Sequence, residues 1–301
     1  MIPRDADCGN GLNIDILNYM KSIYFEQGKI AYWNGEYVPL SEVRISPYDI
    51  GFLRGYGIFD VLPVVHGKPF LWERHFERLF NSAEMLHLNL PVKSDGWKEI
   101  LDHVIKKNTA CESIRTVVSG GPSADSYTPE GTETFLVLPE TKTIYPESIY
   151  TEGVKVMTLD FARQLSSAKI ANHVSAIRNL PEKKKAGAFE ILYVSGGEVF
   201  EAATSNIAMV SHGVIVTPME GILPGVTMNH TLLLAEKSGL KTERRMISFE
   251  EFLLADEVFL TASSKEIVPV VRVDAHVIGT GVPGKVTKKL MEIFANFVKE
   301  Y

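Results

Sequence analysis

The sequence predicts a mixed α/β (α+β) chain folded into two domains. Its 301 residues exceed the usual size of one domain. Apolar, β-rich runs flanked by turn signals alternate with segments in which apolar residues recur at helical spacing. A polar stretch with two prolines, typical of a linker, lies over residues 139–149. We therefore expect a small domain over 29–138, a larger one over 150–301, and an added segment over 1–28, in which residues 14–25 have helical spacing.

Pairs of turn residues locate the hairpins. Asn34-Gly35, His66-Gly67, Gly196-Gly197 and His212-Gly213 each separate two apolar runs, as expected for two-residue turns. The strands expected are the hairpin Ile30–Leu40, then Gly57–Val65, Pro69–Leu71, Ser113–Ser119, Glu133–Leu138, Val154–Leu159, Phe189–Val194, Glu198–Glu201, Asn206–Val210, Val214–Val216 and a strand–turn–strand unit over Glu257–Val271. The helices expected are Trp72–Leu88, Trp97–Asn108, a short one from near Asn172, one whose N-terminus lies at Gly225–Thr227, and Val286–Val298.

Composition is typical of a soluble globular protein, with 45% hydrophobic and 23% charged residues. A net charge of -6 argues against a nucleic-acid partner, and the run Lys183–Lys185 is interpreted as a solvated helix face. With only Cys8 and Cys111, neither a disulfide framework nor a metal site is indicated. No signal peptide and no run of ~18 apolar residues is present, so we expect a cytoplasmic protein without membrane contact.

Two residues suit one kind of chemistry. Lys169 lies between small and apolar neighbours, and Glu201 ends an apolar strand. A buried lysine can lose its proton and attack an aldehyde, and a buried carboxylate can bind the protonated ring nitrogen of an aldehyde cofactor. Each residue taken alone also has a simpler interpretation. Lys169 would be a surface lysine, with Lys155, Lys183–Lys185 and Lys265 as competitors, and Glu201 would form a salt bridge at a strand end.

The order of the motifs around these residues is more specific. H-x-x-R-L-x-x-S-A begins at His75, K-x-x-N at Lys169, A-G-x-x-E at Ala186 and G-x-V-x-E-x-x-x-S-N-I at Gly197. In this order and spacing, the chain resembles the class IV, fold-type IV pyridoxal-phosphate (PLP) enzymes. That family contains branched-chain aminotransferases, D-amino acid aminotransferases and aminodeoxychorismate lyases. The resemblance implies a two-domain enzyme that binds pyridoxal 5′-phosphate between its domains.

The resemblance also assigns roles to residues. Lys169 would form the Schiff base with the cofactor and move the substrate α-proton, and Glu201 would bind the pyridine nitrogen. The phosphate would be held by Arg78 and by the start of a helix after Gly225, where backbone N–H groups are free. The remaining cofactor contacts implied are His173, Ser205, Asn206, Val226, Thr227, Ser263 and Ser264.

Two positions depart from the family pattern. Met228 stands where an arginine is usual, so the phosphate would rely on Arg78, Thr227 and the backbone. His173 stands where many relatives have a tyrosine that bonds the phenolic oxygen of the cofactor. His173 would either substitute for that tyrosine or be a core histidine with satisfied hydrogen bonds, and both interpretations stay open.

Substrate contacts are implied at a second set of positions. These are Arg54, Phe59, Arg115, Ser263 and Ser264, which would bind an amino acid and a 2-oxo acid. We rank a branched-chain-type transaminase first and a D-amino acid transaminase second, then a lyase and a PLP-fold binding protein without catalysis. The resemblance further implies a homodimer with shared active sites, in which the segment Arg54–Asp60 reaches the partner's pocket.

Overall fold

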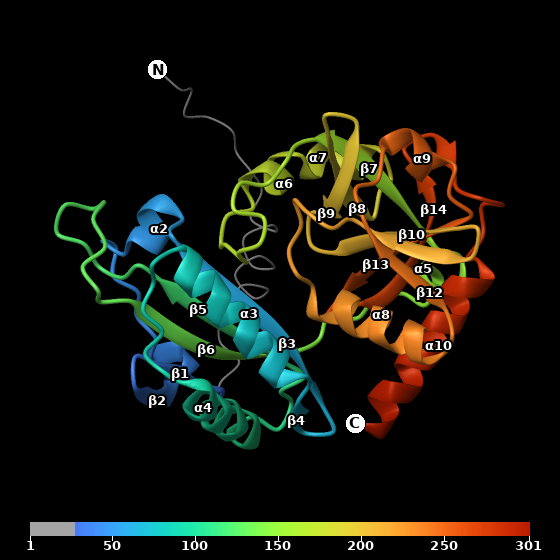
Figure 1. The fold of residues 1–301 in the computed structure, drawn as a ribbon. Helices are drawn as coiled ribbons and strands as arrows, with labels where there is room; N and C mark the ends of the chain where they lie inside the picture. Colours follow the sequence, from blue (N-terminus) through green and yellow to red (C-terminus); the bar gives the residue numbers. More distant parts are fainter. Residues whose placement is uncertain (1–27) are drawn as a thin grey trace, which may run out of the picture.

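The computed structural model describes residues 28–301, which form two β-sheets with helices packed against each (Figure 1). The segment predicted over residues 1–28 lies outside the described residues, apart from Gly28. The mixed α/β class and the presence of both sheets agree with the expectation from the sequence.

The smaller sheet is antiparallel throughout and has six strands in the order β2-β1-β6-β5-β3-β4. Its strands are β1 (Ile30–Trp33), β2 (Glu36–Pro39), β3 (Gly57–Val65), β4 (Lys68–Pro69), β5 (Ser113–Ser119) and β6 (Thr134–Glu140). Along β3, fully buried residues alternate with half-buried ones, so one face of the sheet is covered and the other is more open.

Two helices cover the buried face, α3 (Trp72–Met85) and α4 (Ser94–Lys107) (Figure 1). Leu79 and Ala83 of α3 and Trp97 and Leu101 of α4 are at most 1% exposed and pack against strand residues such as Ile58. Two short elements precede this layer, η1 (Leu40–Glu42) and α2 (Ile50–Arg54). The side chain of Asp49 caps α2 by accepting a hydrogen bond from the backbone N–H of Gly51.

The connection between the two sheets is shorter than the predicted linker. Strand β6 continues to Glu140, and α5 (Ser148–Thr151) begins at Ser148. The irregular chain therefore covers only residues 141–147. Pro139 lies inside β6, because its neighbours still pair with β5.

The larger sheet is mixed and curled, with strand order β12-β11-β10-β13-β14-β7-β8-β9 and β15 paired to β14 (Figure 1). Its strands are β7 (Val154–Asp160), β8 (Glu190–Ser195), β9 (Glu198–Ala202), β10 (Asn206–Ser211), β11 (Val214–Thr217), β12 (Lys241–Arg244), β13 (Glu257–Ala262), β14 (Glu266–Val273) and β15 (His276–Val277). The long connections between β7 and β8 and between β11 and β12 join parallel neighbours.

Helices of the larger domain are α6 (Val174–Arg178), α7 (Leu180–Lys185), α8 (Val226–Lys237), α9 (Phe249–Leu253) and α10 (Lys285–Glu300). Two apolar clusters hold this domain together. One contains Leu192, Ile207 and Leu260 of the strands. The other joins α8 and α10 to the strands through residues such as Met228 and Phe294. Within residues 28–301, no helix is both long enough and apolar enough to cross a membrane.

The predicted hairpin turns are confirmed, and their dihedral angles explain the residue types. Asn34, His66 and His212 have φ values of 47°, 49° and 50°, and each is followed by a glycine whose φ is also positive. Gly196 and Gly197 have φ values of 61° and 82°. Two consecutive positive φ values define the turn that matches the twist of a hairpin, and glycine adopts them at little cost.

Candidate active site

Lys169 lies in the connection between β7 and α6, which passes from the larger domain to the smaller one. The backbone N–H of Lys169 donates to Ser82 Oγ of α3 at 3.0 Å, and its carbonyl accepts from the N–H of Phe59 in β3 at 3.0 Å. The N–H of Ala171 donates to the Gly57 carbonyl at 2.8 Å. The lysine is thus carried by one domain and fixed in place by the other, which puts its side chain between them.

The amine of Lys169 is held in a form that suits nucleophilic chemistry. Nζ lies 4.8 Å from the ring centre of Phe59. Loss of hydration, reinforced by the positive charge of Arg78, lowers the pKa of Lys169 to about 7, although Asp60 and Glu201 oppose the shift. At neutral pH a large share of this amine is unprotonated.

Two of the competing lysines, Lys155 and Lys265, have other partners. Nζ of Lys155 donates to the carbonyl of Ala186 at 2.8 Å. Lys265 is buried and forms an ion pair with Glu190 at 2.7 Å. Among the lysines considered from the sequence, Lys169 has the surroundings that an attacking amine needs.

Glu201 lies at the end of β9, where both of its carboxylate oxygens accept hydrogen bonds. Arg163 Nη1 donates to Oε1 at 2.5 Å, and Asn206 Nδ2 and the N–H of Leu223 donate to Oε2 at 3.2 and 3.0 Å. Burial raises the pKa of Glu201, and the charge of Arg163 opposes this shift. The carboxylate is therefore fixed in orientation and has a cation beside it.

Arg163 is a site residue that the sequence analysis missed. Besides its bond to Glu201, it donates from Nη2 to the carbonyl of Ala168 at 2.7 Å, so it also fixes the residue before Lys169. Its exposed fraction is 17%. An arginine six positions before a candidate lysine was the only signal in the sequence, and no pattern tied it to Glu201.

Arg78 lies on the buried side of α3, in an ion pair that the sequence did not predict. Its Nε and Nη2 donate to the two oxygens of Asp60 at 2.8 and 2.9 Å. Asp60 also contacts Nδ1 of His75 at 2.6 Å. Arg78 and His75 hold the pKa of Asp60 well below its usual range despite burial. Within residues 28–301, Nη1 of Arg78 has no hydrogen-bond partner, so this nitrogen remains available to a ligand.

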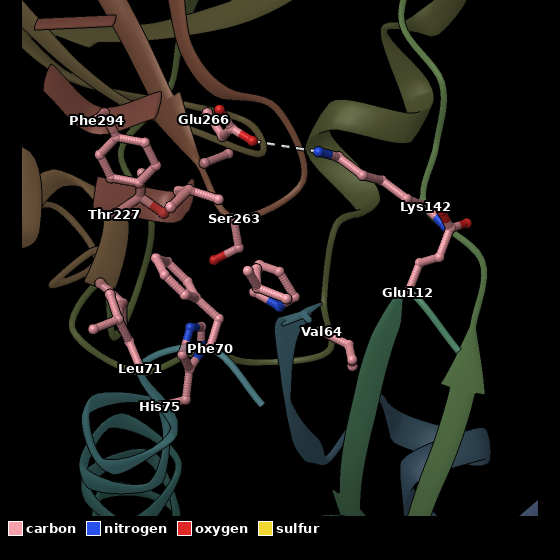
Figure 2. Close-up of a pocket in the computed structure, with 15 residues that line it drawn as sticks. Val64, Phe70, Leu71, His75, Glu112, Lys142, Thr227, Ser263, Glu266 and Phe294 are labelled. Carbon is pink, nitrogen blue, oxygen red and sulfur yellow. Dashed lines mark hydrogen bonds and ion pairs between the residues drawn. The ribbon is translucent and has the colours of Figure 1, made fainter. Parts of the chain in front are cut away.

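A cavity of about 120 Å³ lies between the domains and is bordered by part of the predicted phosphate site (Figure 2). Val226 and Thr227 at the start of α8, Ser263 after β13 and His75 line it. The hydroxyl groups of Thr227 and Ser263 both point inward in Figure 2. Lys142 and Glu266, 3.3 Å apart, and Glu112 lie at its edge. Ser264 does not line this cavity, and Met228 is buried in the apolar cluster under α8.

Two of the remaining predicted residues, Arg115 and His173, lie beside the ring of Phe59. The Arg115 guanidinium lies 5.5 Å from the ring centre, and the His173 ring lies 5.7 Å away. Arg115 also binds Glu140 through two bonds of 2.6 and 3.2 Å. Burial, then the charge of Lys169, lowers the pKa of His173, so its imidazole is neutral at neutral pH.

Ser205 and Asn206 support the strand ends. Ser205 Oγ donates to Glu190 at 2.5 Å, so its hydroxyl is directed toward that buried carboxylate. Asn206 joins Glu201 to the carbonyl of Leu223.

The segment Arg54–Asp60 makes several contacts within its own chain. Tyr56 donates to the Leu86 carbonyl, Phe59 lies beside Lys169 of the same chain, and Asp60 is 1% exposed under α3. Phe59 and Asp60 belong to β3, which pairs with β5 along this stretch. Arg54 is exposed at the end of α2 and contacts none of the other predicted site residues within 28–301.

The described groups fit a phosphorylated pyridine aldehyde. Lys169 offers an amine for the aldehyde, Glu201 a carboxylate for a ring nitrogen, and Thr227, Ser263 and Nη1 of Arg78 donors for a phosphate. The three groups come from both domains and from distant parts of the sequence.

Comparison with known proteins identifies the family of the chain. Residues 57–273, more than half of the chain, match the family described as amino-transferase class IV. The chain therefore belongs to the class IV aminotransferases.

Relatives within the family carry different activities in their names. A putative branched-chain-amino-acid aminotransferase of Methanocaldococcus jannaschii is 28% identical, with 87% of this chain and 94% of that protein covered. A D-alanine aminotransferase of Bacillus licheniformis is 29% identical, with 88% and 96% covered. One similar solved structure is a branched-chain amino acid aminotransferase from T.th. with pyridoxamine 5′-phosphate. It is 25% identical and has a TM-score of 0.82, with 90% of this chain and 94% of that chain covered.

Proposed function

We propose that this protein is a PLP-dependent transaminase that moves an amino group between an amino acid and a 2-oxo acid. Membership of the class IV family, together with the pyridoxamine 5′-phosphate named for the T.th. structure, implies pyridoxal 5′-phosphate as the cofactor. The observation that carries the proposal is the partly neutral amine of Lys169, fixed between the two domains and flanked by the Asp60–Arg78 and Glu201–Arg163 pairs.

The cofactor would lie along the interface between the domains. The phosphate would be bound by Nη1 of Arg78, the hydroxyls of Thr227 and Ser263, and the N–H groups at the start of α8. The pyridine nitrogen would face Glu201, whose orientation depends on Arg163 and Asn206. We propose that His173 lies near the phenolic oxygen, where a neutral imidazole can donate one hydrogen bond.

When bound, the cofactor supplies an aldehyde that takes up the amino group and a protonated ring that accepts electrons from the substrate α-carbon. The residues of this chain supply the proton transfers. Because the pKa of Lys169 is about 7, its Nζ exists in both protonation states at neutral pH and can take the α-proton and later return it. Glu201 would keep the ring nitrogen protonated, and Arg163 favours the ionised carboxylate that this requires.

For the substrate, we propose branched-chain amino acids first and D-amino acids second. Phe59 and the apolar strand residues on the same open face of β3 favour an apolar side chain. A carboxylate would be bound by Arg115, or by Ser263 and Ser264 if Arg115 stays with Glu140. Exposed Arg54, if it belongs to a partner's pocket, favours the D-amino acid alternative. A lyase and a non-catalytic PLP-binding protein remain the third and fourth alternatives.

The working unit would be a homodimer in the cytoplasm. Support comes from the surface around α2, where the side chains of Ile45, Tyr48 and Phe52 are 46%, 62% and 76% exposed. Large apolar and aromatic side chains that are exposed on one short segment are typical of an interface core. Arg54 lies on the same segment, so its side chain would contact a partner subunit that covers this surface.

The test combines a spectrum with a substrate panel. The purified protein with pyridoxal 5′-phosphate should show a visible absorption band that shifts when a productive amino acid is added. L-leucine, L-valine, L-isoleucine and the D-amino acids are each offered with 2-oxoglutarate, pyruvate or branched 2-oxo acids. A protein that binds the cofactor but shifts its band with none of these donors would support the non-catalytic alternative.

A further inference from the structure

A buried group of three titratable side chains lies beside the cavity: Asp60 from β3, and His75 and Arg78 from α3. The exposed fractions of Asp60, His75 and Arg78 are 1%, 1% and 7%. Both donors of Arg78 that face Asp60 are used, and the same carboxylate lies 2.6 Å from Nδ1 of His75. The proposed function uses Arg78 alone from this group and leaves His75 without a role.

The contact with Asp60 determines which nitrogen of His75 carries the proton. An ionised carboxylate only accepts hydrogen bonds, so the 2.6 Å contact requires a proton on Nδ1. The longer 3.3 Å contact between Nδ1 and Nη2 of Arg78 is then a contact between two donors and not a hydrogen bond. Nε2 is then the unprotonated nitrogen of the neutral ring. Within the described residues Nε2 has no hydrogen-bond partner, and the ring is directed into the cavity toward Ser263 (Figure 2).

The cavity offers little net positive charge to an anion. The charge of Arg78 is offset by Asp60, and Lys142 at the edge is offset by Glu266. Met228 at the start of α8 is uncharged and adds no positive charge. A phosphate monoester carries a charge of roughly −1.5 to −2 near neutral pH. The hydroxyls and helix N–H groups contribute dipoles but no whole charge, so a phosphate here lacks a counter-ion.

We propose that His75 is a phosphate-binding residue that takes up a proton when the phosphate binds. The proton comes from solvent and goes to Nε2, which changes from an acceptor into a donor facing the phosphate oxygens. Asp60 stabilises the resulting imidazolium through Nδ1–H. The inference rests on the proposed function, because it takes the cofactor phosphate as the ligand of this cavity.

The charges that face His75 support this change of state. They are Asp60, which favours the imidazolium, and Arg78 and Lys169, which oppose it. Burial is the largest influence and lowers the pKa of His75 in the free protein, so the ring is neutral there at pH 7 to 8. A bound dianion reverses the balance, since an opposite charge in contact favours the protonated ring.

The experiment measures proton uptake on binding. Titration calorimetry with pyridoxine 5′-phosphate, which has no aldehyde and forms no bond to Lys169, is run at pH 7.8 in two buffers of different ionisation enthalpy. The unsubstituted protein should take up close to one proton more per ligand than His75→Asn, in which the amide can still donate to Asp60 but cannot be protonated. The Kd of the unsubstituted protein for this ligand should also rise about tenfold per pH unit above pH 7, whereas the Kd of His75→Asn should change much less.

Two further variants separate this role from a structural one. His66→Asn makes the same chemical change on an exposed turn and should leave proton uptake unchanged. Asp60→Asn should abolish the extra uptake without a matching loss of affinity, since Arg78 then keeps its full charge for the phosphate.

The outcomes distinguish the two proposals. Equal proton uptake in the unsubstituted protein and His75→Asn would overturn the role of His75 and leave the transaminase proposal intact. If His75→Asn does not fold, a Kd of the unsubstituted protein that fails to rise between pH 7 and 9 overturns it equally. Failure of the unsubstituted protein to bind the ligand at all contradicts the proposed function itself.

Discussion

Replacement of Arg163 by glutamine tests how the carboxylate of Glu201 is kept ionised. In the structure Nη1 of Arg163 donates to Glu201 Oε1 at 2.5 Å, and the two side chains are 17% and 5% exposed. Removing one member of a buried pair leaves the other charge without a counter-ion and typically costs about 3–5 kcal/mol. Because Arg163 keeps some contact with water, and because Asn206 and the Leu223 N–H still bind Glu201, we expect about 2–3 kcal/mol.

The cost should depend on pH in a definite direction. Burial already raises the pKa of Glu201, and loss of Arg163 raises it further. A group whose pKa is higher in the folded state binds its proton more tightly there, so the folded state gains stability as pH falls. Arg163→Gln should therefore be more destabilised at pH 8 than at pH 5. The reference pKa of a glutamate in an unfolded chain is about 4.3, which sets the lower end of this window.

Urea unfolding of the apoprotein at pH 5 and pH 8 measures this difference. The matched control is the double variant Arg163→Gln/Glu201→Gln, in which no buried charge is left unpaired. It should recover much of the stability lost at pH 8. A loss that is equal at both pH values, or a double variant as unstable at pH 8 as Arg163→Gln, would refute the proposed coupling.

The remaining predictions concern the proposed cofactor and substrate contacts. Lys169→Ala should abolish turnover and the visible band, and borohydride reduction of the holoprotein should label Lys169; labelling of another lysine would contradict its assignment. Arg78→Ala should weaken PLP binding by about 1.5–3 kcal/mol, and an unchanged Kd in a cofactor titration would contradict the phosphate role. The same substitution should also lower the free energy of unfolding, because it leaves Asp60 unpaired. Ser82→Ala removes the 3.0 Å bond to the Lys169 N–H and should cost about 1 kcal/mol in urea unfolding with a lower kcat, whereas a change in KM alone would argue against this positioning role. Arg54→Ala should raise KM without altering the PLP absorption band. If the active sites are shared between subunits, mixing Arg54→Ala subunits with Lys169→Ala subunits should restore part of the activity. A protein that is a monomer in sedimentation and fully active would exclude shared sites.

Much of the fold could be predicted because it depends on local patterns. The turn pairs such as Gly196-Gly197 are confirmed, since two consecutive positive φ values are a property of neighbouring residues. Strand β5 was predicted with its observed bounds, and α8 begins at Val226, inside the segment Gly225–Thr227 that was predicted to form its N-terminus. The short elements α2, α9 and β12 were missed, because five residues or fewer carry too weak a period.

Some residues of the site could also be predicted from the sequence, and others could not. Lys169, Glu201 and Thr227 could be named from the sequence because each belongs to a motif whose order along the chain is itself informative. The partners that tune them could not. Arg163 meets Glu201, and Asp60 meets Arg78, across gaps of 38 and 18 residues that no periodicity links.

What the sequence by itself determined is therefore the class of fold, the hairpins and the family of chemistry. Only the tertiary structure decided the protonation states and the direction of each side chain. The pKa of Lys169 depends on loss of water and on charges that packing brings near it, and the orientation of Phe59 depends on its place in β3. Burial and Coulomb interactions act through space, so they exist only once the two domains have closed around the lysine.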